Sequence, residues 1–273
     1  MYAASGDLRI FYDTFGFEDD PPLLLLCGLG SQVLYWRDEF CFGLVDRGFF
    51  VVRVDNRDGG LSTQLPDDAE YTLSDMASDV VAVMDALGVE RAHIVGQSLG
   101  GMIAQTLAID HPTRVQTLTS ISSNTGNLEF GQPSDEAVAA LSAPAAATRD
   151  EQIDLNVATR RVWASPSWFD EEETRAYYAE SYDRAHSPTG SVRQFAAFVA
   201  SGSREDGLRS LAIPTLVVHG SLDTLVAPDG GTRTAEIVPD AELLMIEGMG
   251  HDLPVEAWQQ IISAITAMAA RSA

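Results

Sequence analysis

One serine of the sequence lies in a setting that suits nucleophilic chemistry. The segment Gly96-Gln97-Ser98-Leu99-Gly100 follows the apolar run at 92–95 and precedes the apolar segment at 102–109. This order places the serine on a turn from a strand to a helix. Such a sharp turn strains the backbone of the serine, and the flanking glycines leave room for the neighbouring strand and helix. The pattern therefore predicts that Ser98 is a nucleophile.

A serine hydroxyl is a weak nucleophile at neutral pH, so Ser98 needs a histidine base, and that histidine needs a carboxylate to fix its tautomer. After a serine on a strand-to-helix turn, the expected chain order is acid and then histidine. His251 lies in the glycine-rich loop 248–254, whose backbone can present an imidazole at the edge of a sheet. We assign the base to His251 and expect His219 to end a buried strand.

The acid is expected just beyond a strand, at the carboxyl edge of the sheet where catalytic groups gather. Asp223 has this place, because it follows the apolar run at 215–219. Asp252 is the sequence neighbour of the histidine and is expected to point elsewhere. Glu129 follows the preceding strand and is the weaker alternative. We assign the acid to Asp223.

Acyl transfer also needs hydrogen-bond donors for the negative oxygen that develops on the carbonyl group. The turn after Ser98 supplies the backbone N–H of Leu99. The loop Cys27-Gly28-Leu29-Gly30 follows a leucine run and can turn so that the N–H of Leu29 points into the site. Cys27 itself is expected to be a small buried residue, since no partner base is evident. The loop 55–62 is expected to be pinned by charges and to have no catalytic role.

The elements that must position these residues alternate between short apolar runs and segments of helical periodicity. This alternation predicts an α/β fold with a mostly parallel central sheet flanked by helices. Thr72 and Asp75 form a start signal for one helix, and Gly88 ends it. The expected strands are 8–15, 23–26, 49–54, 92–95, 115–121, 215–219 and 242–246, and the expected helices are 73–87, 102–109, 231–238 and a last one after Pro254.

The alternation is interrupted in the middle of the chain. We therefore expect a first part of the core at 1–124, a helical cap insertion at 125–211 and a second part of the core at 212–273. The insertion contains aromatic residues that form either a pocket for the acyl or alcohol group of a substrate or the insertion's own core. They are Trp163, Trp168, Phe169, Tyr177, Tyr178, Tyr182, Phe195 and Phe198.

Composition narrows the classes of partner. The chain has 17 basic residues, all of them arginine, against 40 acidic ones, a net charge of -23. This balance argues against nucleic acid and anionic membranes as partners, and it reflects either a compositional bias or adaptation to salt. Two cysteines imply no disulfide framework, and no leader or membrane span is evident. We expect a cytoplasmic monomer or homodimer that acts on a small molecule.

With these motifs in order, the chain resembles the α/β-hydrolase superfamily over nearly its whole length. The stretches LLLLCGLGS, VVRVDNRDGGLS, AHIVGQSLGGMIAQ, PTLVVHGSLD and IEGMGHDLP are similar to the serine esterases that include aclacinomycin methylesterase and its actinobacterial relatives. The resemblance implies a capped esterase with Ser98, Asp223 and His251 as the triad and Leu29 and Leu99 at the oxyanion hole. The chain departs from the commoner patterns at Cys27-Gly28 and Arg57-Asp58, and neither change touches a triad position.

The expected activity is hydrolysis of carboxylic esters, short to medium acyl or methyl esters, through an acyl-enzyme. No residue cluster calls for a metal or an organic cofactor. A thioesterase, lactonase, C–C bond hydrolase or cofactor-free perhydrolase on the same triad is the alternative. A ligand-binding receptor that keeps the fold is the second.

Overall fold

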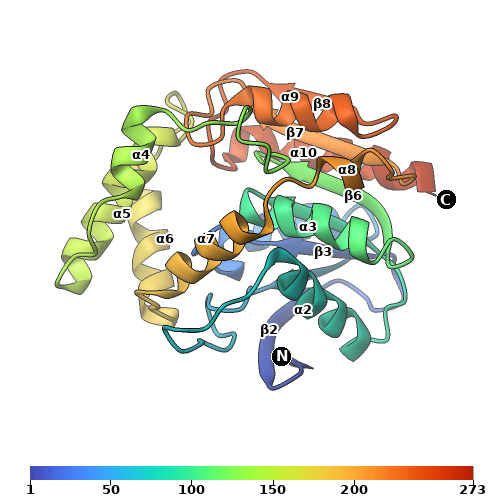
Figure 1. Ribbon diagram of the computed structural model, residues 1–273, viewed down its shortest axis with the longest axis horizontal. Coiled ribbons are helices and arrows are strands. Elements are labelled where there is room, and N and C mark those ends of the chain that lie inside the picture. The colour runs from blue at the N-terminus through green and yellow to red at the C-terminus, as the bar shows by residue number, and fades with distance from the viewer. Residues whose placement is uncertain (273) are drawn as a thin grey trace.

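An eight-stranded sheet forms the centre of the protein in the computed structural model, which describes residues 1–272 (Figure 1). The strand order is β1-β2-β4-β3-β5-β6-β7-β8. β2 runs antiparallel to both β1 and β4, and the other neighbours are parallel. The strands are β1 (Tyr2–Ser5), β2 (Leu8–Phe15), β3 (Pro22–Leu26), β4 (Phe50–Val54), β5 (Ala92–Gln97), β6 (Val115–Ile121), β7 (Thr215–Gly220) and β8 (Glu242–Ile246).

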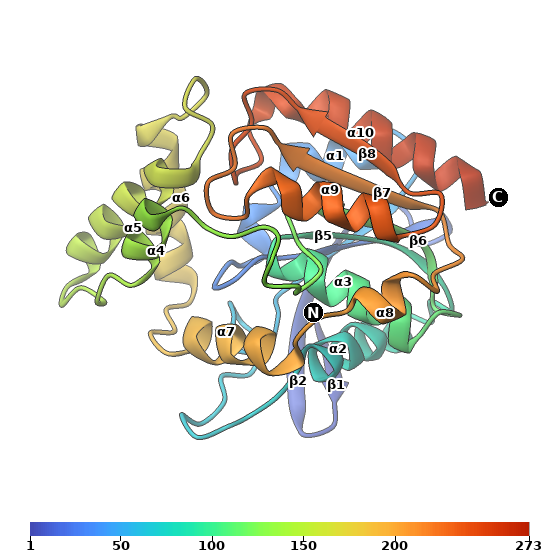
Figure 2. The same ribbon diagram turned by 45° about the horizontal axis from the view of Figure 1, so that its top comes forward.

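Helices cover both faces of this sheet (Figure 2). α1 and α10 contribute to the apolar cluster on one face, whereas α2, α3 and α9 contribute to the cluster on the other. The helices are α1 (Asp38–Val45), α2 (Leu73–Ala86), α3 (Leu99–Asp110), α4 (Asp135–Leu141), α5 (Arg149–Trp163), α6 (Glu171–Arg184), α7 (Gly190–Ser201), α8 (Glu205–Leu208), α9 (Pro228–Ile237) and α10 (Val255–Ala269), with the 3-10 turns η1 (Val33–Tyr35) and η2 (Ala270–Ser272).

The central strands are continuous apolar runs because both of their faces are buried. Leu23 and Leu25 of β3 point into the cluster with α1 and α10, while Leu24 and Leu26 point into the opposite one, and all four are fully buried. Burying one such side chain contributes about 1.5–3 kcal/mol. The alternating faces of β3 thereby join the two helical layers to one sheet.

The predicted α/β class and its mostly parallel sheet are confirmed, and the seven predicted strands are all present. The predicted start of α2 is also confirmed, because Thr72 and Asp75 form a reciprocal capping box. The sequence analysis did not assign β1 or α1. β1 has only four residues, and α1 is an eight-residue helix interrupted by Gly43, so neither has a long periodic pattern.

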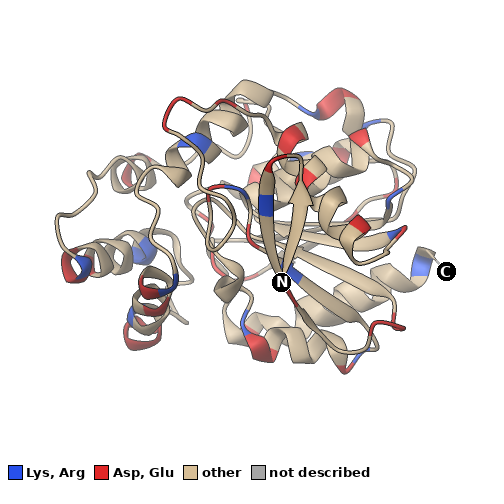
Figure 3. Ribbon diagram, turned by 90° about the horizontal axis from the view of Figure 1, so that it is seen from below, with Lys and Arg blue, Asp and Glu red and all other residues tan. Residues whose placement is uncertain are grey.

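Helices α4–α8 fill the interval between β6 and β7. We call residues 125–211 the insertion; its boundaries remain a prediction. α5 and α6 pack side by side at one end of the molecule, where charges of both signs lie along the helices (Figure 3). Exposed ion pairs link them, each worth at most about 1 kcal/mol. These pairs are Arg149–Asp183, Arg175–Asp154 and Arg161–Glu171. Within the described residues, no helix is long and apolar enough to cross a membrane.

Glu205 in α8, near the end of the insertion, contacts both Asn127 at the start of the insertion and Arg233 of the core. Its carboxylate accepts two hydrogen bonds of 2.8 Å from Arg233 of α9 and one of 3.1 Å from Asn127. The hydrogen bonds from Arg233, which outweigh the effect of burial, lower the pKa of Glu205 to about 2. The folded protein therefore favours the ionised carboxylate.

This pair predicts a pH-dependent difference in stability between the wild type and Glu205→Gln. Because the pKa of Glu205 is depressed on folding, its contribution is complete above its ordinary value of 4.5 and is lost as the pH falls toward about 2. We expect Glu205→Gln to lower the free energy of unfolding by about 1–2 kcal/mol at pH 6, after allowance for solvent near the surface. Urea unfolding at pH 6 and pH 3 measures this. If the wild type and Glu205→Gln differed more in free energy of unfolding at pH 3 than at pH 6, the ion pair between Glu205 and Arg233 would be contradicted.

Candidate active site

Ser98 lies on the turn between β5 and α3 with φ 55° and ψ −120°, a backbone conformation that side-chain-bearing residues rarely adopt. The turn is tight on both sides. A Cβ on Gly96 would collide with the backbone of Gly100, and one on Gly100 would collide with the backbone of Leu26 in β3. The two glycines let α3 pack close enough to the sheet to hold Ser98 in its strained conformation.

Asp223 and His251 meet in the structure. Nδ1 of His251 lies 2.7 Å from Oδ2 of Asp223, and both residues are almost fully buried. Oδ1 of Asp223 accepts hydrogen bonds from the N–H groups of Leu225 at 2.9 Å and Val226 at 2.8 Å. With Nδ1–H donating to the carboxylate, Nε2 of the imidazole carries the lone pair that can accept a proton.

The charge of Asp223 is stabilised in spite of its burial. Burial raises the pKa of Asp223, but the positive charge of His251 and the hydrogen bonds from His219 and His251 outweigh it and hold this pKa well below its ordinary value. His219 Nε2 lies 3.4 Å from Oδ2 of Asp223 and 2.8 Å from the carbonyl oxygen of Val226. Sequence reasoning gave His219 only a place at the end of a strand. The signal for more was its spacing of four residues from Asp223.

The side chain of Gln97 connects the turn of Ser98 to the loop of His251. Gln97 Nε2 donates to the carbonyl oxygen of His251 at 3.5 Å, which links the serine turn to the loop of the histidine. Within residues 1–272, the side chains of Ser98 and His251 make no hydrogen bond to each other. Bonds between a nucleophile and its base are often long before substrate binds.

The two predicted donor residues flank Ser98. Leu99 is the first residue of α3, so its N–H has no acceptor within the helix. A Cβ on Gly28 would lie 3.3 Å from Cβ of Ser98, so the loop with Leu29 passes directly beside the serine. Asn56 holds this loop by donating to the carbonyl oxygen of Cys27 at 2.8 Å.

The other candidates lie apart from these contacts. Glu129 is exposed. Asp252 points away from Asp223 and instead accepts from the hydroxyl of Ser165 at 2.5 Å, as its place in the sequence led us to expect. Burial raises the pKa of the Cys27 thiol well above its ordinary value, so the thiolate needed for attack is disfavoured.

The loop 55–62 is pinned by charges, as predicted. Asp55 pairs with Arg184 at 2.8 Å, and Asp58 pairs with Arg193 at 2.7 Å. Both arginines belong to the insertion, so these two pairs join the insertion to the core beside β4. The loop therefore has a structural task that its sequence indicated only in part, because the partners are distant in the chain.

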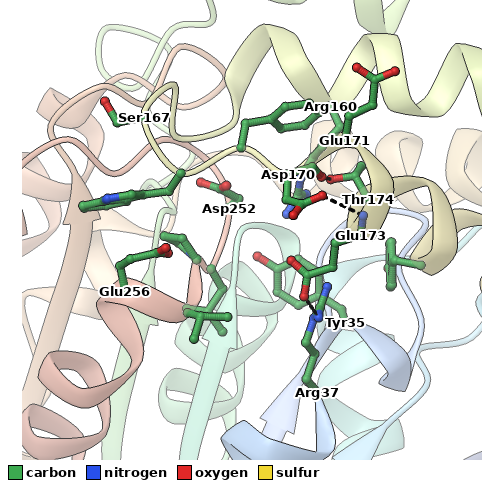
Figure 4. Close-up of a pocket in the computed structure, with 16 residues that line it drawn as sticks. Tyr35, Arg37, Arg160, Ser167, Asp170, Glu171, Glu173, Thr174, Asp252 and Glu256 are labelled. Carbon is green, nitrogen blue, oxygen red and sulfur yellow. Dashed lines mark hydrogen bonds and ion pairs between the residues drawn. The ribbon is translucent and has the colours of Figure 1, made fainter.

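A cavity of about 540 Å³ lies between the insertion and the loop after His251 (Figure 4). Figure 4 shows Asp252 and Tyr35 from the core and Arg160 from α5 around it. Of the aromatic residues in the insertion, three line this cavity: Trp168, Phe169 and Tyr177. Others have different contacts, since Tyr182 stacks on His186 and Phe198 packs against the core. Trp168 and Tyr177 line the cavity and also pack against the core cluster around α1 and α10, so both interpretations of the aromatic residues stay predictions.

Known proteins resemble this chain over most of its length. The sequence profile described as "alpha/beta hydrolase fold" matches residues 21–257. A rhodomycin D methylesterase of a Streptomyces species is 29% identical and covers 96% of this chain and 95% of its own. A 3-oxoadipate enol-lactonase of Acinetobacter baylyi is 27% identical, with 97% and 94% covered.

The solved structures agree on the fold. The crystal structure of an esterase from Rhodococcus superposes with a TM-score of 0.85, at 23% identity, over 100% of this chain and 99% of its own. The profile match spans most of the chain and includes the serine turn, the Asp223 loop and the His251 loop. The chain therefore belongs to the α/β-hydrolase fold family.

Proposed function

We propose that this protein is a serine hydrolase that cleaves carboxylic esters, with Ser98 as nucleophile, His251 as base and Asp223 as the acid that orients it. The observation that carries the proposal is the buried 2.7 Å contact between Asp223 and His251, whose carbonyl oxygen accepts from Gln97, the residue before the strained Ser98. The named activities of the methylesterase and enol-lactonase relatives support it, because both are hydrolyses at an acyl carbon.

In the proposed mechanism, His251 Nε2 takes the proton of Ser98 Oγ while the oxygen attacks the ester carbonyl. Asp223 stabilises the imidazolium that forms, and its depressed pKa keeps it ionised throughout. The N–H groups of Leu29 and Leu99 donate to the tetrahedral oxyanion. The imidazolium then protonates the leaving alcohol, and water activated by the same histidine releases the acid from Ser98.

We propose that the cavity holds part of the substrate, with residues 125–211 acting as a cap over the site. Asp252 and Leu253, which follow His251, line this cavity, whereas Ser98, Asp223 and His251 do not. The volume of the cavity is about 540 Å³, and Trp168, Phe169 and Tyr177 form the apolar part of a lining that is otherwise largely polar and charged. We propose that these aromatic side chains contact the acyl or alcohol group. Short to medium acyl or methyl esters fit this space. A lactone is the second candidate substrate, because the enol-lactonase relative covers nearly the whole chain.

The first prediction concerns the nucleophile. Ser98→Ala removes the attacking oxygen, so we expect kcat for p-nitrophenyl butyrate to fall by about 10⁴-fold or more and labelling by a fluorophosphonate to disappear. Ser78→Ala, an exposed serine on α2, is the control and keeps both. Unchanged turnover in Ser98→Ala would disprove the assignment.

The second prediction separates the two acid candidates. Asp223→Asn keeps the shape of the side chain but removes the charge that fixes the tautomer of His251, so kcat is expected to fall by about 10⁴-fold. Glu129→Gln, at an exposed site, is expected to stay within about twofold, as for a surface change. Steady-state kinetics on both variants decides between them, and the reverse ranking would move the acid to Glu129.

The third prediction tests the cavity. Trp168→Ala removes part of its apolar wall, so KM for p-nitrophenyl octanoate should rise by about tenfold while KM for the acetate stays within about twofold. Phe195→Ala is the matched control, because Phe195 is 49% exposed on α7 and does not line the cavity. Equal effects on both esters would mean that the cavity does not hold the acyl chain.

A further inference from the structure

Two buried polar side chains of the insertion bind the loops that flank Ser98. Ser165 follows α5, Gln194 lies in α7, and both are 0% exposed. Ser165 is 87 residues from its partner Asp252, and Gln194 is 164 residues from its partner Gly30. A buried polar group is costly unless it is hydrogen-bonded, so these contacts fix where each side chain lies.

Ser165 holds the chain on both sides of His251. Its hydroxyl donates to Oδ1 of Asp252 at 2.5 Å and accepts from the N–H of Gly250 at 2.9 Å. Its own N–H donates to the same carboxylate oxygen at 3.0 Å. Among the described residues, Asp252 has no arginine or histidine ion-pair partner within 4.0 Å, so Ser165 is its main polar partner.

The backbone at the end of α5 also accepts hydrogen bonds from both catalytic loops. The N–H of His251 donates to the carbonyl oxygen of Trp163 at 2.6 Å, and the hydroxyl of Thr224 donates to that of Val162 at 3.0 Å. A Cβ on Gly250 would collide with the backbone of Trp163. The loop of the histidine and the loop of Asp223 therefore both lie against this one segment of the insertion.

Gln194 performs the equivalent task for the loop of Leu29. Its Oε1 accepts from the N–H of Gly30 at 2.8 Å, and its Nε2 donates to the carbonyl oxygen of Arg57 at 2.8 Å. Gly30 has φ 64°, so the chain turns sharply directly after Leu29. One amide side chain thus sets the distance between this turn and the loop after β4.

These contacts add to those that the core makes with the loops, in which Asn56 donates to Cys27 and Gln97 donates to the carbonyl oxygen of His251. The loop of His251 contains Gly248 and Gly250, which favour backbone freedom. The contact with Asp223 orients the imidazole ring, but it does not fix how far the ring stands from Ser98. A displacement of about 1 Å at a catalytic group can cost about 100-fold in rate.

We propose that Ser165, with its partner Asp252, and Gln194 are positioning residues, through which the insertion sets the place of the catalytic base and of an oxyanion donor. The insertion is then part of the catalytic apparatus as well as a cover for the substrate. This inference rests on the proposed roles of Ser98 and His251.

The test compares Ser165→Ala, Asp252→Ala and the double variant with p-nitrophenyl acetate, a small ester. Each single change should lower kcat by about 10- to 100-fold. KM should stay within about twofold for Ser165→Ala, because Ser165 does not line the cavity, whereas Asp252 does. The double variant should be no slower than the slower single, since both changes remove one shared contact. Ser142→Ala, at an exposed serine of the insertion that does not line the cavity, is the control and should match the wild type.

Asp252→Asn separates the hydrogen bond of Asp252 from its charge. Gln194→Leu tests the contact between Gln194 and Gly30. Asp252→Asn keeps an acceptor oxygen for Ser165 and should retain most of the kcat that Asp252→Ala loses. Gln194→Leu should lower kcat by about 10-fold or more through the oxyanion donor, with KM again unchanged. Gln152→Leu, whose hydrogen bonds stay inside the insertion, is its control.

Hydrogen exchange measured by mass spectrometry supplies a readout that does not depend on activity. Ser165→Ala should speed exchange in residues 247–254 while the strands of the core keep their protection. Unchanged exchange in residues 247–254, or loss of protection throughout the core, would overturn the inference. A kcat of Ser165→Ala within twofold of the wild type would also overturn it. So would losses of kcat that add in the double variant. If the wild type neither hydrolyses esters nor labels at Ser98, the proposed function fails, and the exchange result still decides whether Ser165 positions the loop.

Discussion

A carboxylate that is buried away from water keeps its charge only if hydrogen bonds replace the solvent, and Asp223 meets this requirement on every side. The N–H groups of Leu225 and Val226 fold the loop around one oxygen, while His251 and His219 approach the other. The same contacts fix the shape of the loop after β7, the tautomer of His251 and the position of the loop after β8. The proposed base therefore depends on how a single buried charge is satisfied.

The parallel sheet places the loop of Asp223 and the turn of Ser98 at the same edge. β3, β5, β6, β7 and β8 run in the same direction, so the loops at their carboxyl ends meet at one edge. Ser98 keeps its strained backbone because α3 packs against β5 at Gly96 and against β3 at Gly100, with no room for a side chain at either glycine. Strain of this kind costs about 1–3 kcal/mol and persists only where the surrounding packing is over-determined. The dense apolar clusters on both faces of the sheet supply that packing.

The insertion contacts the loops at this edge of the sheet through buried polar side chains, whereas the core is held together mainly by apolar packing. Ser165 and Gln194 are fully buried and reach into the loops of the core, and ion pairs from Arg184 and Arg193 hold the loop after β4. Buried polar contacts specify one arrangement, because any other would leave donors or acceptors without partners. In a chain with a net charge of -23, arginines of the insertion that neutralise buried aspartates also limit the repulsion at this junction.

Hydrophobic runs, glycine spacing and capping residues are local signals, and they were enough to predict all strands except β1, the start of α2, the Ser98 turn and the order of Asp223 and His251. They act within a few residues, so the sequence determines them wherever the segment lies. The contacts of Asp252 with Ser165, of Gly30 with Gln194 and of His219 with Asp223 follow from packing. Two of these join segments 87 and 164 residues apart, where no periodicity or spacing carries information. Only the tertiary structure decided them, because a hydrogen bond across such a distance depends on how two independently predicted segments pack against each other.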